Sequence, residues 1–298
     1  TVTTMESMFQ NASAFNSAVV IVNASVVTTM ESMFQNASAF NGAVDIANTA
    51  ALTTMQSMFQ NASAFNQNLN MATESVTTMQ SMFRNASAFA ADVNFTSTAN
   101  VANMDNIFDN ATLFNYNISG WDTSALTSMK EMFNGAQTFD QPIGSWNTSN
   151  VTTMEGMFRN ALSFTKDISA WDVKNVANMT NMLTNTKMTS TNYSALLTEW
   201  SKQEVQPSVT LNTNSTYYNY ASTERDVLTT GSNSWTITDN GISTDYAGSL
   251  EDATTLPTAL NSTLVITNSM FNNVVDDFDR KDTADHVSFN VPYRAYIK

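Results

Sequence analysis

Apolar side chains recur along this chain at an almost constant interval. A pair of apolar residues, usually Met-Phe, returns throughout the first two thirds of the sequence. Its first members are Met8, Met33, Met58, Met82, Ile107, Met132, Met157 and Met182, which lie 25 residues apart except for one interval of 24. A fixed period of about 20 to 50 residues is typical of repeat proteins, whose units stack and contact only their neighbours. The sequence therefore predicts one array of about eight repeats over residues 1–188.

The first half of each repeat has the apolar spacing of a helix. In the third copy, the apolar residues from Leu52 to Ala62 fall three, three, one and three positions apart, as on one face of an α-helix. Thr53 followed by Gln56 fits a helix-capping box, and Asn61 stands where the helix would end in a left-handed residue. We therefore expect a helix of two to three turns in every repeat.

The second half of each repeat alternates at spacing two, as a short β-strand does. The apolar pairs are Val19 and Ile21, Val44 and Ile46, Leu69 and Met71, and Val93 and Phe95. From the fifth copy the spacing widens to three, as in Ile118 and Trp121, which predicts a bulge or a bend. Because strands stack at about 4.8 Å and helices at about 8–10 Å, we expect the strands to line a concave side. The exposed row on that side would be Val20, Asp45, Asn70, Asn94, Ser119, Gly144 and Ser169.

The remaining residues predict a cap and then an extension. Residues 189–241 hold the patterns of two helices and two strands, which would cover the open end of the array, as terminal repeats must. Residues 242–298 hold strand patterns at 264–266 and 287–296, joined by an acidic stretch. These strands are too few for an independent domain, so we expect a β-rich extension that pairs with something else.

Three segments in the second half of the array carry a family resemblance. They read Ile-Ser-Gly-Trp-Asp-Thr-Ser at 118–124, Ile-Gly-Ser-Trp-Asn-Thr-Ser at 143–149 and Ile-Ser-Ala-Trp-Asp-Val-Lys at 168–174, each followed by a Met-x-x-Met-Phe-like stretch. This pattern resembles the repeat of bacterial surface proteins, the mycoplasma-lipoprotein-associated family related to BspA-like leucine-rich repeats. Residues 193–200 and 235–241 resemble the end cap of the same family. The first four copies differ, because they lack the Trp.

The strand and the helix of each repeat, linked right-handedly, predict an α/β fold. It would be a right-handed, leucine-rich-repeat-like solenoid of short parallel strands and helices with an α/β C-terminal cap. The resemblance implies an extracellular or cell-surface location and an adhesive or structural role without enzymatic activity. Similar arrays occur in bacteria, microbial eukaryotes and large viruses, so the source organism stays open.

Charge and composition argue against several partners. The net charge of −14 and the isoelectric point near 4.2 disfavour nucleic acid, which requires a basic face. Lys and Arg are few and scattered, so the sequence offers no patch for anionic lipid. The absence of Cys excludes disulfides, thiolate metal sites and Cys nucleophiles. No stretch of 18 apolar residues occurs, so we predict no transmembrane segment.

The sequence offers little for catalysis or metal binding. His286 is the only histidine, and no nucleophile pattern surrounds it. An acidic stretch could bind Ca²⁺, but it lacks the alternating ligand spacing of a calcium loop, so we favour a solvated loop. Its weak candidate ligands are Asp276, Asp277, Asp279 and Asp282. The Met residues at regular spacing beside Phe are interpreted as core and not as a metal site. We therefore predict no catalytic residue, no metal site and no cofactor.

Asn-x-Ser/Thr motifs are frequent and have two interpretations. If the producer is a eukaryote or its virus, some of them should carry N-linked glycans. Alternatively, Asn-Ala-Ser is only the end of the predicted helix in each repeat. The candidate acceptors are Asn11, Asn36, Asn61, Asn85, Asn117, Asn150, Asn192, Asn214 and Asn261.

The favoured functional hypothesis is a structural protein that forms a filament or a surface layer. Thr1 falls inside a repeat, which indicates either a removed upstream segment or a fragment of a longer protein. An uncovered first coil and a spare β segment on one molecule describe a head-to-tail contact between copies, which generates polymers. The candidate contact residues are Met5, Met8 and Phe9 at one end and Val287, Phe289, Val291 and Tyr293 at the other.

Two other functions are compatible with the sequence. The alternative is a cell-surface adhesin that binds a protein or glycan ligand on the face of the array. Ice binding by a row of Thr residues is a weaker possibility, because those residues lie at the predicted helix starts and not on a flat sheet.

Overall fold

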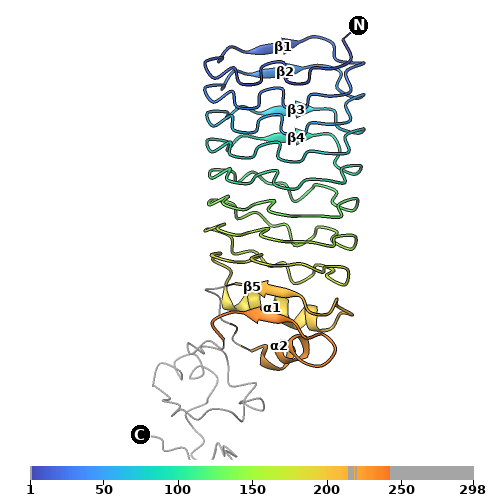
Figure 1. Cartoon of the computed structure of the whole chain (residues 1–298), viewed down its shortest axis with the longest axis vertical. Helices are drawn as coiled ribbons and strands as arrows, with labels where there is room; N and C mark the ends of the chain where they lie inside the picture. Colours follow the sequence, from blue (N-terminus) through green and yellow to red (C-terminus); the bar gives the residue numbers. More distant parts are fainter. Residues whose placement is uncertain (1, 214–217, 219, 242–298) are drawn as a thin grey trace, which may run out of the picture. The chain divides into compact units, whose positions relative to one another are not determined.

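The structure is a computed structural model that describes residues 2–213, 218 and 220–241 (Figure 1). The chain divides into two units, Thr1–Ile242 and Ser243–Lys298, and every described residue belongs to the first. The strands and the acidic stretch expected in residues 242–298 lie outside the described residues.

The described residues form a repeat-like α/β fold with short parallel strand pairs and few helices. The strands are β1 (Val19–Ile21), β2 (Val44–Ile46), β3 (Leu69–Met71), β4 (Val93–Phe95), β5 (Thr210–Asn212) and β6 (Thr236–Thr238). The helices are α1 (Ser190–Ser201) and α2 (Ser222–Thr229). The pairs β1–β2, β3–β4 and β5–β6 are all parallel. Neither α1 nor α2 has the length and apolar character that a membrane span requires.

Successive repeats lie directly beside one another, as Figure 1 shows. We call each repeat a coil and number the coils 1–8. Their turn segments begin at Met5, Met30, Met55, Met79, Met104, Met129, Met154 and Met179. A chain of parallel β-bridges joins equivalent residues of adjacent coils without interruption, from Thr4↔Thr29 to Thr153↔Asn178. Each coil is therefore bonded through its backbone to the coil before it and the coil after it.

The helix predicted in every repeat is wrong. In coil 1, residues 5–12 form consecutive turns, in which the N–H of Gln10 donates to the carbonyl oxygen of Ser7 and the N–H of Ala12 to that of Phe9. Ser7 and Asn11 have φ values of 56° and 62°, the left-handed region, which a right-handed helix cannot contain. Thr53, the residue proposed as the helix cap, acts differently, because its hydroxyl donates to the carbonyl oxygen of Thr28 in the coil before, at 2.9 Å. The concave side was expected because helices stack farther apart than strands. Since the turn segments contain no helix, that reason no longer applies.

Phenylalanine side chains fill the centre of the array in two columns. One column runs through Phe9, Phe34, Phe59, Phe83, Phe108, Phe133 and Phe158. The other runs through Phe15, Phe40, Phe65, Phe89, Phe114, Phe139 and Phe164. Rings from adjacent coils stack nearly parallel, for example Phe34 and Phe59 with centroids 5.2 Å apart and 5° between planes. The columns belong to one continuous hydrophobic core, which confirms the predicted Met-Phe spine.

The second half of the coil changes shape along the array. In β1–β4 the middle residues Val20, Asp45, Asn70 and Asn94 are exposed, as predicted. Coils 5–7 have a turn there instead of a strand, since the N–H of Trp121 donates to the carbonyl oxygen of Ile118, which confirms the expected bend. The exposed row does not continue through these turns, because Ser119 and Gly144 are half-buried and Ser169 is buried.

Residues 189–241 cover the last coil. Thr189 caps α1 by accepting from the N–H of Asn192, and α1 buries Tyr193, Leu196, Leu197 and Trp200. The backbone then returns as β5, where Leu211 forms a parallel bridge with Met179 of coil 8. This arrangement continues the stacking of the coils by one more layer.

Candidate functional site: the turn face and the N-terminal edge

The turn segments carry four columns of peptide groups that point in one direction. In each turn segment, the first, third, fifth and seventh N–H groups donate to carbonyl oxygens of the next coil, as in Ser7 to Glu31 (2.9 Å) and Phe9 to Met33 (2.8 Å). The peptide group that accepts in one coil donates to the coil after it. Three columns are unbroken over all eight coils, and the fourth lacks a bond only between coils 5 and 6. Peptide dipoles aligned in this way add together, as they do along an α-helix.

Left-handed residues make this arrangement possible. The third and seventh positions of every turn segment have positive φ, and Ser or Asn occupies most of them. Gly135 and Gly156 stand at two of these positions, where their φ values of 68° and 60° suit glycine. A Cβ on Gly135 would meet the side-chain Oδ1 of Asn110, which would have to shift to make room for it. Glu131 stands at the third position of coil 6 with a φ of 50°. Its carboxylate accepts hydrogen bonds from Asn106 of coil 5 and Arg159 of coil 7.

The columns leave a row of unused acceptors at coil 1, which we call the N-terminal edge. No described residue donates to the carbonyl oxygens of Thr4, Glu6, Met8 and Gln10, whose equivalents in coils 2–8 accept from the coil before them, apart from the one missing bond. Since all four carbonyls point away from the array, the N-terminal edge is its negative pole. Among the described residues, these four carbonyl oxygens are therefore free to accept hydrogen bonds.

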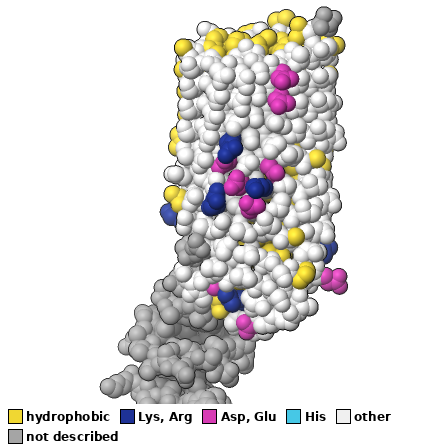
Figure 2. Space-filling view, viewed as in Figure 1, with side chains coloured by type: hydrophobic (Ala, Val, Ile, Leu, Met, Phe, Trp, Pro, Cys, Tyr) yellow, Lys and Arg dark blue, Asp and Glu magenta, His cyan; other side chains and the backbone are white. Residues whose placement is uncertain are grey.

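The same edge exposes apolar side chains. Met8 is 52% exposed and Val22 81%, whereas residues equivalent to Met8 in coils 2–7 are fully buried. Phe9 and Phe15, the ends of the two phenylalanine columns, are half-buried. Figure 2 shows hydrophobic side chains gathered at the end of the array where the chain begins, above a side with few charged side chains. Met5 is already buried, so of the predicted contact residues in coil 1 only Met8 and Phe9 are accessible.

The opposite end of the columns is covered. The N–H of Leu183 in coil 8 donates to the carbonyl oxygen of Asn212 at 3.1 Å, and the N–H of Asn181 donates to the Oδ1 of the same residue at 2.9 Å. Asn212 thus acts on two columns as an N-cap residue acts on a helix. Within the described residues, two columns are therefore capped after coil 8, whereas the acceptors of coil 1 have no donor.

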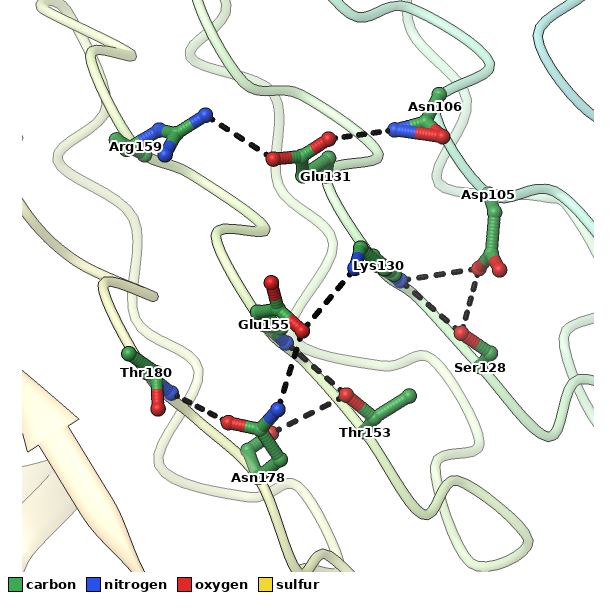
Figure 3. Close-up of polar contacts among 10 residues, drawn as sticks. All are labelled: Asp105, Asn106, Ser128, Lys130, Glu131, Thr153, Glu155, Arg159, Asn178 and Thr180. Atoms are coloured by element: carbon green, nitrogen blue, oxygen red, sulfur yellow. Dashed lines mark hydrogen bonds and ion pairs between the residues drawn. The ribbon is translucent and has the colours of Figure 1, made fainter.

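We call the surface formed by the turn segments the turn face. A cluster of charged residues extends across the turn face of coils 5–8 (Figure 3). Arg159 contacts Glu131 at 3.0 Å, and the amide of Asn106 donates to the other carboxylate oxygen of Glu131 at 2.9 Å. Lys130 contacts Glu155 at 3.2 Å, and Glu155 also accepts from the amide of Asn178. Ser128 contacts Asp105, and the backbone N–H of Lys130 donates to both of these residues. Thr153 contacts Asn178 and accepts from the backbone N–H of Glu155, and the backbone N–H of Thr180 donates to Asn178.

This cluster has the properties of a structural cross-link between coils. Its salt bridges are partly exposed, with 42% and 36% of the side chains accessible for Lys130 and Glu155, so each contributes at most about 1 kcal/mol. Every carboxylate in it faces a donor from a neighbouring coil, which leaves no charge free for chemistry. Among the described residues, no group of three or more His, Cys, Asp or Glu side chains could hold a metal ion. The absence of enzymatic activity stays a prediction.

Asp109 is the most buried carboxylate of the turn face. Its side chain is 2% exposed, and it accepts from Arg84 at 2.9 Å and from the amide of Asn134 at 2.7 Å. Burial raises the pKa of Asp109 above its usual value, against the opposing effect of these two donors.

A second buried network holds the cap together. The hydroxyl of Tyr193 in α1 donates to Asp239 at 2.9 Å, and Arg225 of α2 forms an ion pair with the same carboxylate at 3.0 Å. Burial, followed by the nearby Asp239 carboxylate, raises the pKa of Tyr193 well above its usual value, so the phenol stays protonated and donates. This network fixes α1 and α2 to the strand that ends at residue 238.

The predicted glycan acceptors occupy two kinds of position. Amide nitrogens of Asn36, Asn61 and Asn85 donate to the Asn one coil earlier, at 2.8, 2.6 and 2.7 Å, in a ladder that begins at Asn11. The amides of Asn150 and Asn192 donate to backbone oxygens of Ser124 and Thr165. Asn117 is exposed, and its side-chain nitrogen has no partner among the described residues. Of the described candidates outside the ladder, Asn117 has the most accessible amide.

Several predicted site residues cannot be placed. The weak calcium candidates Asp276, Asp277, Asp279 and Asp282 lie outside the described residues, as do His286, Asn214 and Asn261. The same holds for Val287, Phe289, Val291 and Tyr293, the predicted contact residues of the extension.

Sequence reasoning missed the columns of aligned peptides. The signal available was the placement of Ser, Asn and Gly four residues apart in seven of the eight repeats, with Gly135 and Gly156 at positions where a helix would disfavour them. Those residue types share a tolerance of positive φ, which indicates turns.

One protein family matches the chain. Residues 1–96 and residues 77–200 both match the family described as "Mycoplasma protein of unknown function, DUF285". None of the curated proteins matches the sequence.

Proposed function

The chain belongs to the Mycoplasma DUF285 family of unknown function, and from this premise we propose that it is a non-enzymatic, extracellular structural protein. Its coils would form a right-handed solenoid of the BspA-like surface-protein type, which assembles head to tail into a filament or a surface layer. The polar composition supports an extracellular location, because apart from a few charges the polar residues are mostly Asn, Thr and Ser.

The observation that carries this proposal is the N-terminal edge. Coil 1 offers a row of carbonyl acceptors and an apolar end, and both are features that every later coil uses to bind the coil before it. A partner that supplies N–H groups and apolar side chains would extend the array by the interactions that already hold it together. In the full chain, we propose that the extension at 242–298 reaches the edge of the next copy.

The polarity of the columns determines the symmetry of assembly. Within the turn columns, two N-terminal edges that met face to face would oppose eight carbonyl oxygens, which disfavours that pairing. We therefore propose a heterologous contact, and heterologous contacts that do not close into rings give open polymers. We expect a ladder of oligomers that does not stop at the dimer.

Sedimentation velocity and electron microscopy of the full chain test this proposal. The wild-type chain should show oligomers that grow with concentration. The double variant Met8→Glu with Val22→Glu should remain monomeric, because it adds charge to an apolar, negative edge. The matched control is Leu113→Glu with Leu162→Glu, which changes side chains of similar exposure away from the edge, 51% and 43% accessible. A wild-type chain that stays monomeric at all concentrations, or that stops at a dimer, contradicts the proposal.

A second function is supported by the face that contains β1–β4. The exposed row Val20, Asp45, Asn70 and Asn94 repeats at the strand spacing, and the amide of Asn94 donates to Asn70 at 2.8 Å. Such an ordered, solvent-facing row could present a ligand-binding surface, as an adhesin for a protein or a glycan requires. Binding of the monomeric double variant to immobilised matrix proteins or glycans would support this function independently of assembly.

A further inference from the structure

The change of coil shape between coils 4 and 5 leaves a hollow in the surface. Coil 4 ends its strand half with Val93 and Phe95 at spacing two, whereas coil 5 continues with Ile118 and Trp121 at spacing three. The two backbones do not match at this step. The result is a half-open cavity of about 210 Å³ lined by residues 95–99 of coil 4 and 120–122 of coil 5.

Trp121 differs from the other Trp residues of the array because it lies at this step. The indole N–H groups of Trp146 and Trp171 donate to the carbonyl oxygens of Ile118 and Ile143 in the coil before, and both side chains are buried. The indole N–H of Trp121 has no such partner among the described residues, and its side chain is half-buried. Trp121 therefore keeps both an accessible aromatic surface and a free donor.

The lining of the cavity combines aromatic and hydrogen-bonding groups. The ring of Trp121 stacks on Phe95 of coil 4, with centroids 5.9 Å apart and 27° between planes, and on Phe108 of its own coil at 6.0 Å, so these rings support the indole while the rest of it is accessible. Asp122 is exposed beside them, and hydrogen bonds from Ser124 to one carboxylate oxygen lower its pKa, which keeps the group ionised at neutral pH. The other carboxylate oxygen of Asp122 has no partner among the described residues. No Lys or Arg lines the cavity.

These features select the chemical class of the ligand. The carboxylate repels anions, and the indole N–H requires an acceptor, which a simple cation cannot supply. A hydroxyl group both donates and accepts, so a neutral polyol satisfies Asp122 and Trp121 together. A pyranose ring adds an apolar face of C–H groups that stacks on an aromatic side chain. The cavity is smaller than the roughly 300–1,000 Å³ clefts that hold drug-sized ligands, which suits one sugar ring.

We propose that this cavity is a binding site for a single neutral pyranose unit, stacked on Trp121 and hydrogen-bonded to Asp122. The site deepens the second function proposed above, a ligand-binding surface, and does not depend on head-to-tail assembly. Because the cavity is shallow and open, one ring should bind with millimolar affinity, and repeated weak contacts from a polymeric array would raise the total affinity.

Tryptophan fluorescence of the full chain tests the site directly. The protein has five Trp residues, and the other four, Trp146, Trp171, Trp200 and Trp235, are at most 4% exposed. Trp121 should therefore account for nearly all quenching by acrylamide. The probes are the methyl glycosides of glucose, galactose, mannose and N-acetylglucosamine, with choline chloride and sodium phosphate as cationic and anionic comparisons. At least one glycoside should reduce quenching in a saturable manner, while phosphate should not.

Variants separate the site from non-specific effects. Saturation-transfer NMR detects bound glycoside without relying on Trp emission. Trp121→Ala should abolish the transfer signal, and Trp121→Phe, which preserves most of the packing, should weaken binding at least fivefold. Asp122→Asn should weaken it to a similar degree, and the control Trp235→Phe in the cap should bind as wild type does. Circular dichroism confirms that each variant is folded.

Three outcomes would overturn the proposal. They are saturable binding of choline without binding of any glycoside, an unchanged transfer signal in the folded Trp121→Phe and Trp121→Ala variants, and no binding of any probe. In the last two cases, glycan or protein binding by the whole chain would still leave the wider ligand-binding function standing, at another place on the array.

Discussion

Asn and Ser residues with positive φ are the local feature on which the repeat depends. Asn61 has a φ of 61° and donates its amide to Asn36, so one residue type satisfies both the backbone conformation and the side-chain ladder. The left-handed conformation of Asn61 could be predicted from the sequence. What could not be predicted was that Ser57 shares this conformation, because Ser rarely adopts it without support from its surroundings.

The carboxylates of Asp109 and Asp122 should give opposite pH dependences of stability. Burial raises the pKa of Asp109, so its stabilising effect is complete below the usual value of 3.8 and is lost as the pH rises through the folded-state pKa. Hydrogen bonds from Ser124 lower the pKa of Asp122, so its contribution is present above 3.8 and is lost as the pH falls through the folded-state pKa.

Thermal unfolding of Asp109→Asn and Asp122→Asn between about pH 3 and pH 7 measures this difference. The melting temperature of wild type minus that of Asp109→Asn should rise as the pH is lowered. The same difference for Asp122→Asn should shrink. Because each variant is compared with wild type at the same pH, the other acidic residues cancel. Equal pH slopes for the two variants would contradict the assignment.

At the scale of the element, the turn segment shows why a helix was predicted. Consecutive turns place an apolar residue inside the core at intervals of three or four, which is also the spacing of a helix face. The strands β1–β4 were predicted with their observed bounds, because a period of two has no such competitor. Hydrophobic spacing alone therefore identified which residues form the core, but not the backbone conformation of the turn half.

The candidate sites were predicted to different degrees. Met8 and Phe9 were recognised as an uncovered end because the repeat pattern shows which neighbour they lack. The widened spacing from Ile118 to Trp121 indicated a bend, but the cavity beside it depends on how two unlike coils meet. That meeting depends on the register between backbones, which one sequence does not specify.

The phenylalanine columns predict a dependence of stability on position. Phe83 is fully buried and stacks on Phe59, Phe89 and Phe108, so Phe83→Ala should lower the free energy of unfolding by about 3–5 kcal/mol. Phe9 is half-buried at the N-terminal edge, where its ring has a neighbouring coil on one side only. Phe9→Ala should therefore lower the free energy of unfolding by clearly less than Phe83→Ala does.

Urea unfolding of the two variants gives the comparison. Phe83→Leu is the natural control, since Leu183 occupies the equivalent position in coil 8 and is fully buried. It should retain most of the stability that Phe83→Ala loses. If Phe9→Ala is as destabilising as Phe83→Ala in the monomeric chain, the edge is not open.

At the scale of the described unit, stability should be distributed unevenly between the two ends. Coil 8 has β5 and α1 beside it and two of its four turn-column donors are capped by Asn212, while coil 1 has a described neighbour on one side only. In a stacked array, the opening of an end coil breaks one interface and the opening of an inner coil breaks two. The N-terminal coil should therefore open most readily.

Hydrogen exchange measured by mass spectrometry can locate this opening and report on assembly at the same time. Residues 17–27 and 67–76 occupy equivalent places in coils 1 and 3 and differ in sequence, whereas the turn segments of coils 1 and 2 are identical and cannot be distinguished. In the monomeric Met8→Glu, Val22→Glu variant, peptides from residues 17–27 should exchange more than about tenfold faster than peptides from residues 67–76. This ratio corresponds to a difference of about 1.4 kcal/mol in opening free energy. In the assembled wild-type chain, this difference should shrink, because a partner then covers the edge. Equal exchange of both segments in the monomer would mean that coil 1 is already covered by its own chain, and head-to-tail growth would lose its binding surface.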